Sequence, residues 1–150
     1  MFTKILYPTD FSKKSQHALE MVKKLQEAGG KEIILVHCVD IREVNTMAEM
    51  EGFSSLQYSS ILEEVHEELR RKASEKMDAI AKELRNLNFK VEERLVDGIP
   101  FKEILRLAKK EEADVIVMGS SGKGLLAEVV LGSTTDKVVR DAEIPVIIVK

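Results

Sequence analysis

The chain has 150 residues, of which 44% are hydrophobic and 33% charged, and its net charge is -3. This balance is typical of one soluble globular domain, and it leaves no electrostatic case for binding nucleic acid or an anionic membrane surface. The single cysteine, Cys38, cannot form an internal disulfide, and no apolar run approaches the ~20 residues that span a bilayer. The N-terminal segment has too short an apolar run for a signal peptide, so we expect a cytoplasmic protein.

Segments with strand-like and helix-like patterns alternate along the chain. Short apolar runs predict strands at residues 3–8, 32–39, 89–96, 114–119 and 144–149. A first helix is predicted after a cap at Asp10 or Ser12 and stops at Gly29 and Gly30. Three further helices are predicted over residues 59–87, from about Pro100 onward, and over residues 132–142.

Residues 40–58 show no steady apolar period and are predicted to form a loop. They contain Met47, Met50 and Phe53 among polar residues. Most connections are shorter than ~6 residues, so a loop of this length is expected to be a lid, a contact surface or a partly disordered segment.

The alternation predicts an α/β fold in a single domain over residues 1–150, with an open parallel five-stranded sheet and helices on both faces. The third strand carries four charged residues, Lys90, Glu92, Glu93 and Arg94. It therefore belongs at a solvated edge, whereas the first, second and fourth strands are apolar and belong in the middle. The strand order 3-2-1-4-5 meets these conditions and places the topological switch between the first and fourth strands.

The fifth strand would form the other edge of this sheet. It consists of Pro145, Val146, Ile147, Ile148 and Val149. Because an open apolar edge invites pairing, we predict a homodimer in which the same strand of a second copy covers it. The alternative is that a loop of the chain itself covers the edge.

The stretch VIVMGSSGKGLLAEVVLGSTTDKVV (residues 115–139) is rich in glycine where the predicted strand order expects a ligand crevice. It does not contain the Walker pattern, because Leu125 stands where that pattern requires lysine. Its match to the dinucleotide pattern precedes the last helix instead of the first.

Two separate anion-binding elements fit this stretch better. Gly119 and Gly122 bracket a turn after a strand, and Gly132 precedes hydroxyl residues at the start of a helix. Held at a fixed separation, these elements suit a polyphosphate, to which Lys123 adds a charge. The alternative is that the glycines serve only the turns and that Ser133 only caps its helix.

The segment MGSSGKGLLAEVVLGSTTDKVV resembles the nucleotide-binding signature of the universal stress protein family, G-x2-G-x9-G-[ST]. Gly119, Gly122, Gly132 and Ser133 occupy its fixed positions. KILYPTDFS resembles the opening strand and turn of the family, and PVIIV resembles its closing strand, so the resemblance covers the whole chain. It implies a flavodoxin-like fold, a dimer through the last strand and ATP binding.

The resemblance also implies which residues meet the nucleotide. The adenosine end would lie against Pro8, Thr9, Asp10 and Val39, with Met118 beside the ribose or base. The phosphates would meet Gly119, Ser121, Gly122, Gly132, Ser133, Thr134 and Thr135. Many members of the family have histidine where this chain has Ser121, and this departure bears on the affinity for ATP. A divalent ion, Mg or Mn, can accompany the triphosphate, although no carboxylate cluster would hold it without the nucleotide.

Three functions follow from these observations. The first is an ATP-binding universal stress protein that acts as a nucleotide-dependent switch or sensor, with residues 40–58 as the coupling segment and an unknown signalling partner. The second is a slow or partner-dependent ATPase whose catalytic residues are unknown, with Asp10 and, more distantly, Glu128 as candidate bases. The third is an interaction scaffold without a ligand, against which the intact glycine set argues.

Other patterns favour structural roles. The histidines His17, His37 and His66 lack metal-ligand spacing, so we expect ordinary core or surface residues and no metal site. Cys38 should point to the opposite face of its strand from His37 and be buried. Asp97 and Lys150 occupy roughly the positions of a response-regulator receiver, but the acidic pair that a receiver has at its first strand is missing.

Overall fold

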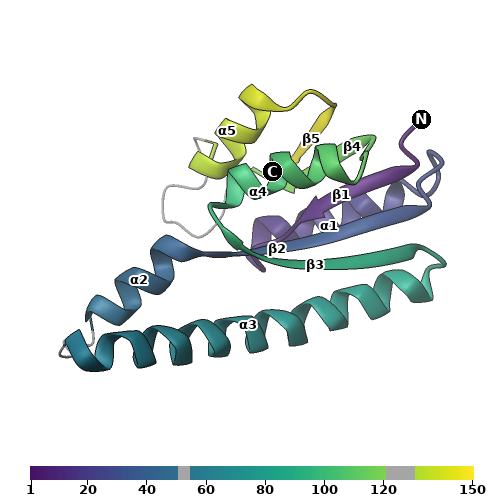
Figure 1. Ribbon diagram of the computed structural model, residues 1–150. Coiled ribbons are helices and arrows are strands. Elements are labelled where there is room, and N and C mark those ends of the chain that lie inside the picture. The colour runs from purple at the N-terminus through teal and green to yellow at the C-terminus, as the bar shows by residue number, and fades with distance from the viewer. Residues whose placement is uncertain (51–54, 121–130) are drawn as a thin grey trace.

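A computed structural model describes residues 1–50, 55–120 and 131–150 as a sheet between layers of helices (Figure 1). The strands are β1 (Lys4–Pro8), β2 (Glu32–Asp40), β3 (Lys90–Gly98), β4 (Val115–Gly119) and β5 (Val146–Val149). The helices are α1 (Lys13–Lys24), α2 (Ile41–Met50), α3 (Ser55–Asn86), α4 (Pro100–Lys110) and α5 (Ser133–Asp141). Within these described ranges, no helix combines the length and the hydropathy that crossing a membrane requires.

All neighbouring strands in the sheet are parallel, and their order is β3-β2-β1-β4-β5. The predicted order is therefore confirmed. The physical reason is the one that the composition indicates: the charged residues of β3 remain exposed or half-exposed at one edge, while β1, β2 and β4 are mostly buried in the middle.

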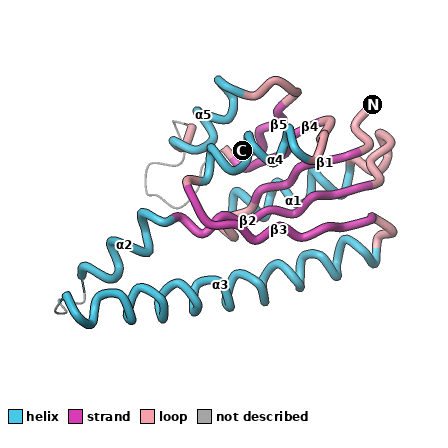
Figure 2. The backbone as a smooth tube through the Cα atoms, in the orientation of Figure 1, coloured by secondary structure: helices cyan, strands magenta, loops and turns pink. Residues whose placement is uncertain are grey.

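Side chains of the central strands alternate between two cores. On one face, Tyr7, Leu35 and Val117 pack in a cluster with residues of α1 and α3. On the other face, Leu6 and Ile116 pack with residues of α4 and α5. Figure 2 shows α3 running along β3, with α4 and α5 on the other side of the strands. Successive residues of a strand point to opposite faces, so helices are required on both.

The prediction of a long loop over residues 40–58 is wrong. The helix α2 occupies Ile41–Met50, and α3 begins at Ser55 instead of residue 59. Asp40 Oδ1 accepts the N–H of Arg42 over 2.9 Å and so caps α2. Six of its ten residues are alanine, arginine, glutamate or methionine, which are good helix formers, and the helix packs beside α3. The recurrence of Ile41, Val44 and Met47 every three residues was the available signal.

The helix α3 has 32 residues and is about 48 Å long, so it exceeds the sheet that it covers. Met77, Ala81 and Leu84, in its C-terminal part, are buried against the strands. Its N-terminal part extends past the sheet beside α2, as Figure 1 shows. We call residues 41–50 and 58–69 the helical arm.

Candidate functional site

The turn that follows β1 is held by its own polar groups. The N–H of Thr9 donates to the Val36 carbonyl over 2.8 Å and so extends the hydrogen bonding between β1 and β2. Asp10 Oδ1 accepts the N–H of Ser12 over 3.0 Å, and Ser12 Oγ accepts the N–H of Ser15 over 3.2 Å. Ser12 is therefore the N-cap of α1. The sequence predicts either Asp10 or Ser12 as this cap. The second carboxylate oxygen of Asp10 makes no hydrogen bond within the described residues and is available to a ligand.

A buried network fixes the side chain of Thr9. Ser15 Oγ donates to Thr9 Oγ1 over 2.6 Å, and the N–H of Phe11 donates to the same oxygen over 3.1 Å. The buried hydroxyl of Tyr7 donates to the Ser15 carbonyl over 2.6 Å. Burial raises the pKa of Tyr7, so the hydroxyl keeps the proton that this bond requires. Both lone pairs of Thr9 Oγ1 are occupied and the Thr9 N–H is bound to Val36, so the O–H of its side chain is the donor that remains for a ligand.

Phe11 joins this turn to β2 and α3. Its φ of 64° lies in the left-handed region, which a bulky residue rarely adopts. The ring stacks on His37 with 4.5 Å between centroids, and Lys76 Nζ lies 5.1 Å from its centre. His37 Nδ1 lies 2.7 Å from the carbonyl oxygen of Thr9, which can only accept, so Nδ1 donates. These contacts offset the backbone strain and hold the turn in one conformation.

The start of α5 is fastened to the end of β4. The N–H of Gly132 donates to the Ser120 carbonyl over 3.0 Å, and Thr135 Oγ1 donates to the Gly119 carbonyl over 3.0 Å. The N–H of Ser120 in turn donates to the Val149 carbonyl of β5 over 2.9 Å. The helix N-terminus therefore lies at the carboxyl end of β4, beside the topological switch of the sheet.

Gly119 also sets the distance between β4 and α1. A Cβ on Gly119 would lie 2.7 Å from the carbonyl carbon of Lys14 and 2.9 Å from the backbone nitrogen of Ser15. A side chain here would force the first turn of α1 to move. The glycine thus brings the end of β4 against the segment that follows the Thr9 turn, and packing alone is a reason for its presence.

Only some of the hydrogen-bond donors at the start of α5 are accessible to a ligand, because others are bonded within the protein. The N–H of Gly132 and the hydroxyl of Thr135 are engaged within the protein. The first N–H groups of a helix have no intrahelical acceptor and form the positive end of its dipole. Ser133 is exposed and Thr134 is half-buried. The N–H and hydroxyl groups of these two residues are therefore the accessible donors of this helix start.

The remaining predicted residues divide into two groups. Pro8, Val39 and Met118 are buried at the carboxyl ends of β1, β2 and β4, so the sheet brings them to the same edge as Thr9 and Asp10. Ser121, Gly122 and Lys123, and with them the turn between Gly119 and Gly122, lie outside the described residues.

Two carboxylates that were not predicted as binding residues lie along the same edge. Arg42 donates to Asp40 over 2.9 and 2.7 Å, and these hydrogen bonds hold the pKa of Asp40 below its usual range. Burial opposes ionisation of Asp97, but hydrogen bonds from His66 (2.9 Å) and Arg70 (2.7 Å) lower its pKa. For Asp40, its position at the end of the apolar strand β2 was the available signal; Asp97 lies on the charged strand β3, which offered no such signal. Both are engaged by cations, and the described ranges contain no cluster of three metal-ligating side chains.

Cys38 lies half-buried on β2. Burial raises the pKa of its thiol to about 12, and the negative charges of Glu103 and Asp40 act in the same direction. The thiol is therefore protonated at physiological pH, which agrees with the predicted structural role and opposes a role as a nucleophile.

The geometry can be compared with known proteins. The model of the universal stress protein family matches residues 1–150. The chain is 41% identical over 157 residues to the universal stress protein MJ0577 of Methanocaldococcus jannaschii, covering 100% of this chain and 96% of that relative. The chain belongs to the universal stress protein family. The solved structure of MJ0577 has a TM-score of 0.85 to this universal stress protein at 40% identity, over 100% of this chain and 96% of that one.

Two structures of the same fold hold adenine nucleotides. A universal stress protein in complex with cAMP has a TM-score of 0.58 at 21% identity, and covers 99% of this chain and 96% of its own. A universal stress protein family protein from Arabidopsis thaliana with AMP bound has a TM-score of 0.61 at 16% identity, and covers 99% and 91%. At these identities the likeness is one of fold.

Proposed function

We propose that this universal stress protein binds an adenine nucleotide, ATP in particular, between the turn after β1 and the start of α5. The observation that carries this proposal is the attachment of the α5 N-terminus to Gly119 and Ser120 beside the topological switch. Open α/β sheets bind ligands at that point, and a helix N-terminus favours anions. Both nucleotide-bound structures share the fold, which agrees with the proposal.

The proposed contacts follow from which groups remain accessible. The adenosine end would lie against Thr9, Asp10 and Val39, with Pro8 and Met118 packed behind them. The phosphates would meet the N–H and hydroxyl groups of Ser133 and Thr134. The start of α5 would be held against β4 by Gly119, Gly132 and Thr135. Further contacts to the phosphates would come from the adjoining segment, from Ser121, Gly122 and Lys123. A divalent ion, Mg or Mn, would be held through the phosphates.

We further propose that the nucleotide acts as a switch through α2. The strand β2 ends at Asp40 and α2 begins at Ile41, with the Asp40 side chain capping the helix. A nucleotide against Val39 would therefore act on the start of α2 without an intervening linker. Hydrogen exchange tests this: ATP should change the protection of residues 41–50, and identical protection with and without ATP would contradict the switch.

The proposed assembly is a homodimer through β5 that acts in the cytoplasm, where ATP is available. In the described part of the chain, β5 pairs with β4 on one side only, and its four residues are half-exposed. A second β5 would satisfy the outward backbone groups of this edge.

Calorimetry with ATP, ADP, AMP and GTP tests nucleotide binding directly. The Ser133→Asp variant should weaken ATP binding by about tenfold or more, since it places a carboxylate among the phosphate donors. The variant should fold normally, because an acidic residue in the first turn favours a helix. Ser74→Asp, at an exposed position of α3, is the matched control. The absence of binding by wild-type protein to all four nucleotides would refute the proposal.

A further inference from the structure

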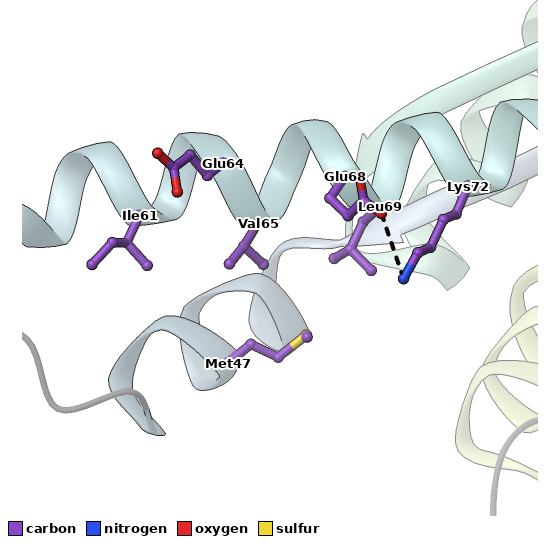
Figure 3. A pocket seen from close by; sticks show the side chains of 7 residues that line it. All are labelled: Met47, Ile61, Glu64, Val65, Glu68, Leu69 and Lys72. Atoms are coloured by element: carbon purple, nitrogen blue, oxygen red, sulfur yellow. Dashed lines mark ion pairs between the residues drawn. The ribbon is translucent and has the colours of Figure 1, made fainter.

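The helical arm carries a groove that lies apart from the candidate nucleotide site. Its volume is about 310 Å³, and it lies between α2 and α3 (Figure 3). Its apolar lining consists of Met47, Ile61, Val65 and Leu69. In Figure 3 the three residues of α3 point toward α2, from which Met47 extends to meet them. Met47 is 46% exposed, so the groove is open to solvent.

The apolar lining continues the core-facing stripe of α3. Ile61, Val65, Leu69, Ala73 and Met77 follow one another at four-residue spacing, so each lies about 40° around the helix from the one before and together they form a continuous, slowly winding stripe. The last two are buried, with 3% and 1% exposed, whereas the first three are only half-buried on the arm. The stripe therefore continues past the sheet over about 12 Å, where the described strands do not cover it.

The surroundings of the groove are acidic. Residues 41–50 and 58–69 contain six glutamates and one arginine, and that arginine, Arg42, is paired with Asp40. The glutamates are Glu43, Glu49, Glu63, Glu64, Glu67 and Glu68. Among the described residues, Glu68 alone of these six has ion pairs, with Arg71 at 2.7 Å and Lys72 at 3.6 Å. Of these six, Glu64 and Glu68 line the groove, together with the Lys72 that pairs with Glu68. Within the described ranges, Glu64 therefore leaves the apolar groove with an unpaired negative charge, which is complementary to an apolar and cationic partner.

A second copy of this arm would not suit the groove. Two arms side by side would bring like charges together, which opposes association. The adjacent basic residues do not remedy this, because they are already engaged within the chain. Arg70 pairs with Asp97 at 2.7 Å, and Arg71 and Lys72 pair with Glu68.

We propose that this groove docks a cationic amphipathic helix of a partner protein. Leucine-like side chains of that helix would lie against Ile61, Val65 and Leu69, with lysine or arginine beside Glu64. A helix presents apolar residues at i, i+4 and i+7 along a line of about the same length as the stripe. It would pack beside α2 and α3 at the ordinary interhelical distance of about 8–10 Å. The inference goes beyond nucleotide binding and does not depend on it.

A synthetic helical peptide with leucines on one face and lysines on the other tests the proposal. Fluorescence anisotropy with the full chain, without nucleotide, should show micromolar binding that weakens as salt is added. The same peptide with glutamate for lysine should not bind. Met47→Glu should weaken binding by about tenfold or more. The matched control is Leu87→Glu, since Leu87 is 39% exposed and lies outside the arm, and it should leave binding unchanged.

Charge reversal supplies an independent test on exposed residues. The variant Glu64→Lys should weaken binding of the cationic peptide, whereas Glu27→Lys, at an exposed site outside the arm, should not. The proposal is overturned if both peptides bind equally, if neither binds, or if Met47→Glu has no effect. It is also overturned if Met47→Glu lowers the molar mass in light scattering, because the occupant would then be a second copy. Calorimetry with ATP on the same samples shows whether a protein that does not bind the peptide still binds ATP, so the two proposals can be refuted separately.

Discussion

The hydroxyl of Thr135 donates a hydrogen bond to the carbonyl oxygen of Gly119 over 3.0 Å, across sixteen positions of the chain. Thr135 is only 3% exposed, so this bond is made out of contact with water. It fixes the first turn of α5 at the end of β4, and Gly119 in turn lies against the backbone of α1. One side chain therefore aligns the helix start with the turn after β1, on which the proposed site depends.

Thr135→Val tests this relationship, because valine keeps the shape of threonine and removes the donor. The Gly119 carbonyl would lose its side-chain partner, and we expect unfolding in urea to become easier by about 1–3 kcal/mol. ATP affinity should fall as well, since α5 would no longer be fastened to β4. Thr135→Ser keeps the hydroxyl and should retain most of both quantities. Equal stability of wild-type protein and Thr135→Val would show that the bond contributes nothing.

Asp10→Asn separates binding from hydrolysis. The asparagine oxygen can still accept the N–H of Ser12, so the turn and the melting temperature should be retained. Its amide nitrogen cannot accept a hydrogen bond from a ligand hydroxyl as the second carboxylate oxygen can, so ATP affinity should fall several-fold. Calorimetry and steady-state phosphate release measure the two effects. Normal binding combined with abolished phosphate release would instead support the slow ATPase.

A proline at one position of β5 tests the dimer. The Pro145 and Val149 carbonyls accept from β4, so the backbone groups of the alternate residues Val146 and Ile148 point to the outer edge. Ile148→Pro removes an outward N–H and should convert the proposed dimer to a monomer that is still folded. Light scattering measures the molar mass. Ile147→Pro, which removes a bond to β4, should instead destabilise the chain itself. A dimer that persists in Ile148→Pro would contradict pairing through β5.

The thiol of Cys38 should be slow to react. Burial raises its pKa from an ordinary 9.0 to about 12, so the folded protein keeps a proton that the unfolded chain loses between those values. This contribution to stability is present below about pH 9 and is lost as the pH rises toward 12. Mass spectrometry after iodoacetamide treatment should show slow alkylation in the native protein and fast alkylation in urea. Cys38→Ser should weaken the alkaline loss of stability, and rapid native alkylation would contradict the burial argument.

Local composition was enough to predict the strand order, because the charges of β3 exclude it from the interior and the apolar runs of β1, β2 and β4 require burial. The cap at Ser12 was likewise predictable, since a serine hydroxyl satisfies helix N–H groups wherever a helix begins. The helix α2 was missed because it has only ten residues, too few to show a steady apolar period, and because α3 supplies the apolar surface beside which it packs.

The amino-acid sequence by itself determined the fold, the order of the strands and the place of the glycine signature, because these depend on hydrophobic period and on residue type. Only the tertiary structure decided which groups of that signature are free. Gly132 and Thr135, both predicted to meet phosphate, direct their N–H and hydroxyl to carbonyls of Ser120 and Gly119, and Ser133 and Thr134 are left accessible. Only the tertiary structure likewise shows that the apolar stripe on the helical arm is partly exposed. Burial depends on what lies opposite a side chain in space and not on its neighbours in the chain.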